Sequence, residues 1–279
     1  MTKKNITLSN NETIYYIEEG LDKKEVFVLI HGNQSSGVHH KPLIELLKSK
    51  YHIIAPDLRG FGDSSYHQPV KSINDFRDDI IELLEELKID KYHILGWSTG
   101  GAVALSMAAE KPEQVEKLVL VESCSYRGYP IFKKDELGQA LIGQYYQTIE
   151  ELSLDPVQVN PLITAFEIGN APLINAIWDA AIYTASKPDP KENELFISET
   201  MKQRNIADVL WCLTTFNMSS FSNGVTLGDN SISKVTCPVL TIWGDKDAVV
   251  LEYMIDETVE ALKDVKKVVF ENSGHSPYV

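Results

Sequence analysis

The chain has 279 residues, 43% of them hydrophobic, which is enough for one compact unit built around a sizeable core. Its 40 acidic and 26 basic side chains give a net charge of −14 at pH 7, which argues against nucleic acids and anionic membranes as partners. The sequence begins without an apolar signal core and has no apolar run long enough to cross a bilayer, so we expect a cytoplasmic protein.

The first part of the chain predicts a strand pair followed by two buried strands. Residues 5–8 and 13–17 are typical of an antiparallel pair, with two asparagines at the turn between them. Short apolar runs at 26–30 and 52–55 then predict the first strands of a parallel sheet.

A helix is predicted to begin near Ser72, because Asp75 stands three residues later as a capping-box partner. The apolar residues that follow recur at helical spacing on one face: Phe76, Ile80, Leu83 and Leu87.

The sequence Gly-Trp-Ser-Thr-Gly at 96–100 lies between an apolar run at 92–95 and a small-residue helical run at 102–109. This context predicts a tight strand-to-helix turn with Ser98 at its centre, the nucleophile elbow of G-x-S-x-G enzymes. Ser98 would then stand at a helix N-terminus, where free N–H groups favour developing negative charge.

After a strand at 118–121 the pattern changes. Residues 125–235 predict several helices and no strand. The expected helical stretches are 132–152, 156–166, 172–184 and 192–216.

The last part of the chain supplies an acid and a histidine, each just past a predicted strand. The strand at 238–243 is followed by Asp245 and Asp247, and the apolar run at 268–270 is followed by a polar loop that carries His275. Open α/β sheets place their sites at these carboxyl ends.

Four motifs in this order resemble the α/β-hydrolase superfamily. They are His-Gly-Asn at 31–33, the turn Asp-Leu-Arg-Gly-Phe-Gly-Asp-Ser at 57–64, the serine elbow, and the terminal Gly274-His275. The resemblance implies an α/β-hydrolase fold, a mostly parallel sheet flanked by helices with a helical cap inserted after the sixth strand. The core would comprise 1–124 and 236–279, and the cap 125–235.

The resemblance also implies roles for five residues. Ser98 would be the nucleophile, His275 the general base and acid, and Asp247 the carboxylate that orients the histidine. The backbone N–H groups of Asn33 and Thr99 would form the oxyanion hole.

Asp245 competes with Asp247 for the acid role, but the family pattern sets the acid three residues after Gly244, which favours Asp247. By the same pattern, His31 and Arg59 are expected to be structural.

The substrate pocket is predicted from residues beside the nucleophile and from cap aromatics. Gln34 and Trp97 would contribute from the core, and Trp178 and Trp211 from the cap. For each cap aromatic, packing between helices is the competing interpretation.

A serine nucleophile excludes the alkyl-ester chemistry of the aspartate-dependent dehalogenases and epoxide hydrolases that share this pattern. It predicts a hydrolase of a small acyl compound, either a carboxylic ester, a lactone or a thioester. A C–C bond hydrolase and a non-enzymatic small-ligand sensor are the alternatives.

No cofactor or metal is expected, because the sequence has no phosphate loop, dinucleotide fingerprint or zinc-ligand spacing. The adjacent His39 and His40 point to different sides. The three widely spaced cysteines are expected to be reduced, and the oligomeric state stays open. The family's closing helix after the histidine loop has no counterpart before Val279, so we expect another segment or a partner to cover that face, or the sequence to be truncated there.

Overall fold

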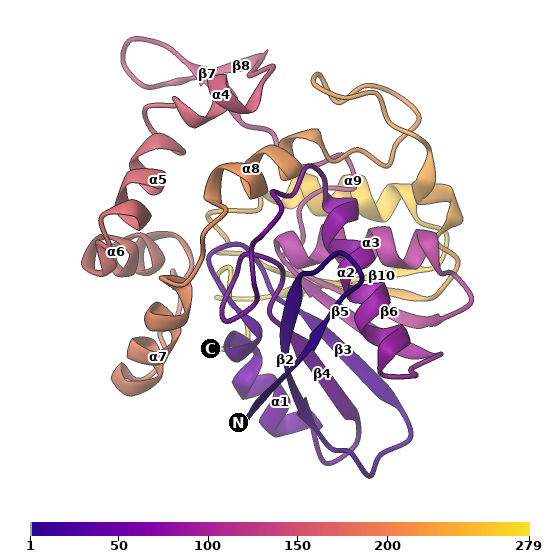
Figure 1. The fold of residues 1–279 in the computed structure, drawn as a ribbon. Coiled ribbons are helices and arrows are strands. Elements are labelled where there is room, and N and C mark those ends of the chain that lie inside the picture. Colours follow the sequence, from indigo (N-terminus) through magenta and orange to yellow (C-terminus); the bar gives the residue numbers. More distant parts are fainter. Residues whose placement is uncertain (1) are drawn as a thin grey trace.

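The computed structural model describes residues 2–279, and its centre is an eight-stranded sheet (Figure 1). In chain order the strands are β1 (Lys3–Thr7), β2 (Thr13–Glu19), β3 (Val26–Ile30), β4 (His52–Pro56), β5 (Tyr92–Trp97), β6 (Val115–Val121), β9 (Val239–Gly244) and β10 (Val265–Phe270). Their spatial order is β1-β2-β4-β3-β5-β6-β9-β10. The β1–β2 and β2–β4 pairs are antiparallel and all other pairs are parallel. The predicted mostly parallel sheet is confirmed.

The order of the strands positions the site. The chain leaves β3 toward β4 on one side and returns as β5 on the other. The loops that follow β3 and β5 therefore meet at a switch point at the carboxyl edge of the sheet, which is where ligands bind in open α/β folds.

The helices outside the β6–β9 connection are α1 (Lys41–Leu47), which follows the 3-10 turn η1 (Gly37–His40), and α2 (Ile73–Glu86), α3 (Thr99–Glu110) and α9 (Glu252–Ala261). A second 3-10 turn, η2 (Ser231–Lys234), precedes β9. At the start of α2, the predicted capping box between Ser72 and Asp75 is present, and the Ser72 N–H donates to Asp75 Oδ2 at 3.0 Å.

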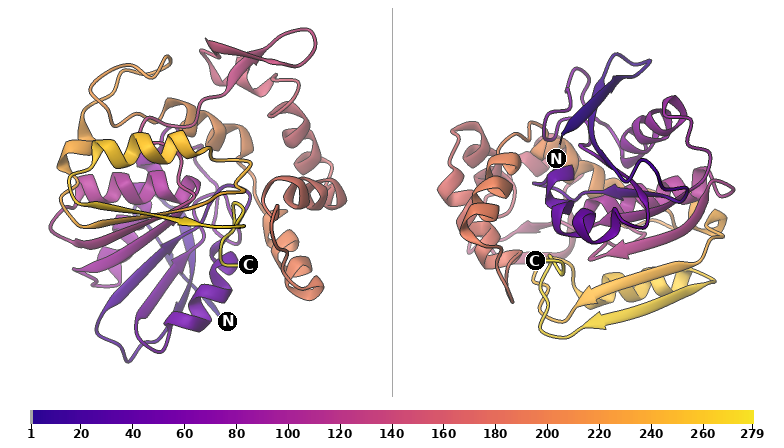
Figure 2. Two further views of the ribbon diagram at one scale, coloured as in Figure 1. Left: turned by 180° about the vertical axis from the view of Figure 1, so that it is seen from behind. Right: turned by 90° about the horizontal axis from the view of Figure 1, so that it is seen from below.

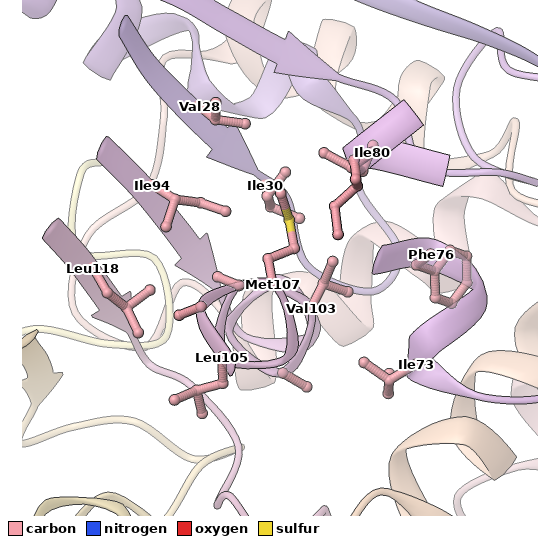
Figure 3. Close-up of a cluster of buried hydrophobic side chains, with 14 of the residues drawn as sticks. Val28, Ile30, Ile73, Phe76, Ile80, Ile94, Val103, Leu105, Met107 and Leu118 are labelled. Carbon is pink, nitrogen blue, oxygen red and sulfur yellow. The ribbon is translucent and has the colours of Figure 1, made fainter. Parts of the chain in front are cut away.

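The core has two sides because strand side chains alternate between the faces of the sheet. On one side Val28 and Ile30 of β3 pack against α2 and α3, as Figure 3 shows around Met107. On the other side Leu29 packs with Ile44 of α1 and with residues from the long connection after β6. The loops at the carboxyl edge of the sheet thus lie between two packed layers.

The connection between β6 and η2, which we call the cap segment, forms an arch beside the sheet, on the side where the C-terminus lies (Figure 2). It contains β7 (Phe132–Lys134), β8 (Ala140–Tyr145), α4 (Ile149–Ser153), α5 (Asn160–Glu167), α6 (Ala171–Ala181), α7 (Pro190–Thr200) and α8 (Ile206–Thr215).

Two predictions for the cap segment are wrong. Residues 132–145 form a β-hairpin and not a helix, because Asp135 and Gly138 make a turn. The Asp135 carboxylate accepts two backbone N–H groups, and Gly138 has a φ of +79°. The single helix expected over 192–216 is two helices, since the chain between them bonds to the core through Gln203 and Asn205.

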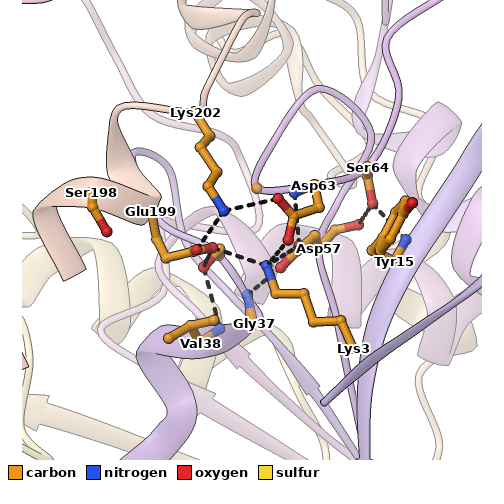
Figure 4. A network of polar contacts seen from close by, with 12 residues as sticks. Lys3, Tyr15, Gly37, Val38, Asp57, Asp63, Ser64, Ser198, Glu199 and Lys202 are labelled. Atoms are coloured by element: carbon orange, nitrogen blue, oxygen red, sulfur yellow. Dashed lines mark hydrogen bonds and ion pairs between the residues drawn. The ribbon is translucent and has the colours of Figure 1, made fainter. Parts of the chain in front are cut away.

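A partly buried ionic network ties the N-terminal strand to the cap segment (Figure 4). The Lys3 ammonium lies 2.8 Å from Asp57, 2.7 Å from Asp63 and 2.9 Å from Glu199 at the end of α7. Lys202 joins Asp63 and Glu199 from the other side. Although burial opposes it, these carboxylates raise the pKa of Lys3 above its usual value, so the charge is held at all ordinary pH values.

Replacing Lys3 with methionine is expected to lower the free energy of unfolding by about 3 kcal/mol, because Asp57 then stays buried without its cation, whereas Glu199 keeps Lys202. Lys4 is the matched control, since it pairs with Glu18 with half of its own side chain exposed. Lys4→Met should cost less than about 1 kcal/mol. Urea unfolding measures both, and equal midpoint shifts would contradict the network's role.

No helix within residues 2–279 is both long and apolar enough to span a membrane.

Candidate active site

Ser98 lies on a strained turn between β5 and α3. Its backbone has φ +53° and ψ −119°, a conformation that costs energy for any residue with a side chain. The flanking glycines make the turn possible. A Cβ on Gly96 would lie 2.2 Å from the Gly100 carbonyl oxygen, and one on Gly100 would lie 2.3 Å from that of Ile30. This is the predicted elbow geometry, with the serine at the N-terminus of α3.

The loop after β3 lies directly against this serine. A Cβ on Gly32 would be 3.0 Å from Ser98 Cβ, so any other residue there would push the two loops apart by a few tenths of an ångström. Among residues 2–279, the backbone N–H groups of Asn33 and Thr99 have no hydrogen-bond acceptor. Both are therefore available to an oxygen atom bound beside Ser98.

Residues of the cap segment hydrogen-bond to the Asn33 loop and hold it in place. Gln203 Nε2 donates to Asn33 Oδ1 at 2.8 Å, and its Oε1 accepts the Gln34 N–H at 2.9 Å. The Thr200 hydroxyl donates to the Gln34 carbonyl at 2.6 Å. These bonds hold the loop at Gln34, whose backbone has a φ of +56°, next to the Asn33 N–H.

Asp247 and His275 form a buried pair. Asp247 Oδ2 lies 2.7 Å from His275 Nδ1, and its Oδ1 accepts the N–H groups of Val249 and Val250 at 2.7 and 3.0 Å. Although burial opposes it, His275 keeps the pKa of Asp247 below its usual value. Asp245 has no hydrogen bond to His275, and its nearest cation is Lys246 at 3.5 Å. The carboxylate therefore fixes Nδ1 and leaves Nε2 as the free ring nitrogen.

Trp97 anchors the histidine loop, because its Nε1 donates to the His275 carbonyl at 2.7 Å. Ser98 and His275 line the same cavity, although no hydrogen bond joins their side chains in residues 2–279. Such bonds are often loose in unliganded enzymes.

The cavity encloses about 170 Å³ and is bounded by the serine turn, the Asn33 loop and the cap segment. Its wall is mostly apolar, with Ile131, Leu162, Ile177, Ile182, Leu210 and Val250 among the lining residues. The polar lining groups are neutral amides, hydroxyls and the imidazole. No Lys, Arg, Asp or Glu lines it within residues 2–279.

Three of the four predicted pocket residues line this cavity: Gln34, Trp97 and Trp178. Trp211 does not, and that prediction is corrected. Leu210 and Leu213 of α8 face the cavity, whereas Trp211 lies about 100° around the helix from Leu210 and borders a different hollow beside α2.

His31 and Arg59 make structural contacts, as expected. His31 is fully buried and its Nε2 accepts the Leu58 N–H at 2.9 Å. Burial lowers the pKa of His31 to about 3, so it stays neutral. Arg59 forms a paired contact with Asp79 of α2, with Nε 2.7 Å from Oδ2. His39 accepts the Ser36 N–H at the start of η1 and stacks on Phe196.

Sequence reasoning missed two residues. Gln203 had no signal, because its partners in the Asn33 loop lie 169 and 170 residues away along the chain. Glu122 follows β6 directly, at the carboxyl edge of the sheet, and that position was the signal. It is fully buried, and its carboxylate lies within 4.8 Å of Asp247 and of a His275 ring nitrogen.

Comparison with known proteins identifies the family. The model of the α/β-hydrolase fold family matches residues 25–279. The chain belongs to this family. Lipase 1 of Psychrobacter immobilis is 26% identical, over 99% of this chain and 79% of that protein. The (E)-2-((N-methylformamido)methylene)succinate hydrolase of Acinetobacter baylyi is 24% identical, over 99% of this chain and 92% of that protein.

Solved structures agree with the α/β-hydrolase fold. An esterase from Exiguobacterium antarcticum superposes with a TM-score of 0.74 at 20% identity, covering 98% of this chain and 92% of that one. The family match, with these esterase and lipase relatives, supports a hydrolase of the α/β fold.

Proposed function

We propose that this α/β-hydrolase is a serine hydrolase that cleaves small carboxylic esters through an acyl-enzyme. The observation that carries the proposal is the 2.7 Å contact between His275 Nδ1 and Asp247 in the cavity that Ser98 also lines. Nucleophile, base and orienting carboxylate are then within one site.

In this mechanism His275 Nε2 takes the proton of Ser98 as its hydroxyl oxygen attacks the ester carbonyl. The negative charge of the tetrahedral intermediate lies between the N–H groups of Asn33 and Thr99 at the positive end of α3. His275 returns the proton to the leaving alcohol. Water, activated by the same imidazole, then hydrolyses the acyl-enzyme. Lactones and thioesters follow the same steps.

The wall of the cavity supports an uncharged acyl group. A carboxylate on the acyl chain would be buried among apolar side chains without a cation, which costs several kcal/mol. The neutral amides of Gln34 and Gln158 can receive a hydrogen-bonding group, and the rest of the wall favours hydrocarbon.

A matched pair of esters tests this proposal. The four-carbon acyl groups of p-nitrophenyl butyrate and p-nitrophenyl hemisuccinate differ in a terminal carboxylate. We expect kcat/KM to favour the butyrate by at least about 100-fold, from the cost of an unpaired buried charge. Equal values would contradict the neutral-pocket assignment.

Two further measurements separate the alternative functions. A vinylogous diketone cleaved faster than every ester would favour C–C hydrolysis. Labelling of Ser98 by a fluorophosphonate, with negligible turnover of all substrates, would favour a small-ligand sensor.

The acidic composition and three unpaired cysteines support a cytoplasmic location for the enzyme.

A further inference from the structure

Glu122 is a buried acid that the mechanism above does not use. It directly follows β6, has φ +45°, and its side chain is fully buried. Its Oε1 accepts the Gly244 N–H at 2.7 Å, which links the end of β6 to the end of β9. Its Oε2 has no N–H or O–H donor from another residue within residues 2–279.

The neighbours of Glu122 give no charge that could balance an ionised carboxylate. The titratable groups around it are Asp247 after β9, and His275 and Tyr278 on the C-terminal loop. No Lys or Arg is among them. Asp247 is already ionised and paired with His275, so a second negative charge within 4.8 Å would be strongly unfavourable.

We propose that Glu122 is a positioning residue that carries a proton on Oε2 and donates it in a hydrogen bond to the Asp247 carboxylate. Asp247 Oδ1 already accepts two N–H groups, and Oδ2 accepts one from His275, so an acceptor position remains. The added donor holds the carboxylate against the imidazole without adding charge. The catalytic consequence of this inference rests on the proposed function, whereas the protonation state of Glu122 does not.

The protonated state has a consequence for stability. Burial, with Asp247 as the next cause, raises the pKa of Glu122 well above its ordinary value of 4.5, to about 10. Between these two values the folded chain holds a proton that the unfolded chain has lost, so wild-type stability falls as the pH rises. A glutamine at this position cannot titrate. The stability of E122Q relative to wild type should therefore increase steadily from about pH 5 to about pH 9.

The test compares E122Q, which keeps a donor for Asp247 and an acceptor for the Gly244 N–H, with E122L, which removes both. Urea midpoints across this pH range report the protonation state whether or not any ester is hydrolysed. A gap between E122Q and wild type that stays constant with pH would overturn the proposal, because it would mean that Glu122 is ionised. That result is distinct from an inactive wild type, which would refute the esterase instead.

Ester hydrolysis supplies the second readout. E122Q should keep kcat within about threefold of wild type and leave the acidic limb of kcat/KM in place, since no charge beside His275 has changed. E122L should lower kcat by roughly ten- to a hundredfold at nearly constant KM, from the lost bond to a charged group. A shift of the acidic limb in E122Q, or equal kcat in the two variants, would contradict the assignment.

Discussion

Replacing Ser98 with alanine is expected to lower kcat for ester hydrolysis by about 10⁴- to 10⁶-fold while KM changes little. Without the hydroxyl no acyl-enzyme forms. The N–H groups of Asn33 and Thr99 can then stabilise only the transition state for direct attack of water on the ester. The strained backbone of Ser98 accepts alanine as readily as serine, since both carry a Cβ. Stability should therefore stay near wild type, which separates lost chemistry from lost folding.

The measurement is burst and steady-state hydrolysis of p-nitrophenyl butyrate, together with labelling by a fluorophosphonate. Ser233→Ala is the matched control, because Ser233 is an exposed serine on η2, away from the cavity. The Ser233→Ala protein should react with the fluorophosphonate and hydrolyse p-nitrophenyl butyrate as wild type does. A Ser98→Ala protein that retained a burst would place the nucleophile elsewhere.

Asp247→Asn is expected to lower kcat by about 10⁴-fold, since an amide no longer holds the Nδ1–H tautomer or stabilises the imidazolium. The 2.7 Å contact to His275 and the two N–H donors to Oδ1 make this carboxylate part of a preorganised unit. Its neutral replacement keeps the size of the side chain, so the loss is one of charge and tautomer.

Asp245→Asn is the control for this variant, because it makes the same chemical change two residues away on the same turn. Asp245 does not contact His275, so its replacement should change kcat by less than about threefold. Steady-state hydrolysis from about pH 5 to about pH 9 measures both variants. A larger loss in Asp245→Asn would assign the acid role to that residue.

The parallel strands could be predicted from the sequence because each contains a short apolar run that a loop follows. The runs at 26–30 and 92–95 match β3 and β5 within two residues. The same logic placed Ser98, Asp247 and His275 at one edge, since parallel strands share their carboxyl ends. Chain order and strand register determine that edge without any knowledge of side-chain contacts.

Other features depend on contacts that no local pattern carries. The hairpin at β7 and β8 was missed because its turn, at Asp135 and Gly138, is shorter than the stretch of sequence over which helical periodicity is judged. Trp211 was misplaced because membership of a helix does not say which face is buried. The role of Gln203 arises only when distant loops meet, so propensity and periodicity carry no trace of it. Glu122 is different, because its position directly after a predicted strand was a signal that the sequence analysis did not use.

The bonds of Gln203 to Asn33 and Gln34 have a practical meaning for redesign. The cap segment and the Asn33 loop are joined through one amide group, so they are not independent modules. Exchanging the cap segment for that of another hydrolase to alter acyl preference would leave the Asn33 loop without its brace. A functional chimera must therefore keep residues 200–205 of this chain together with its core. Otherwise the foreign cap must supply equivalent hydrogen bonds to the Asn33 loop.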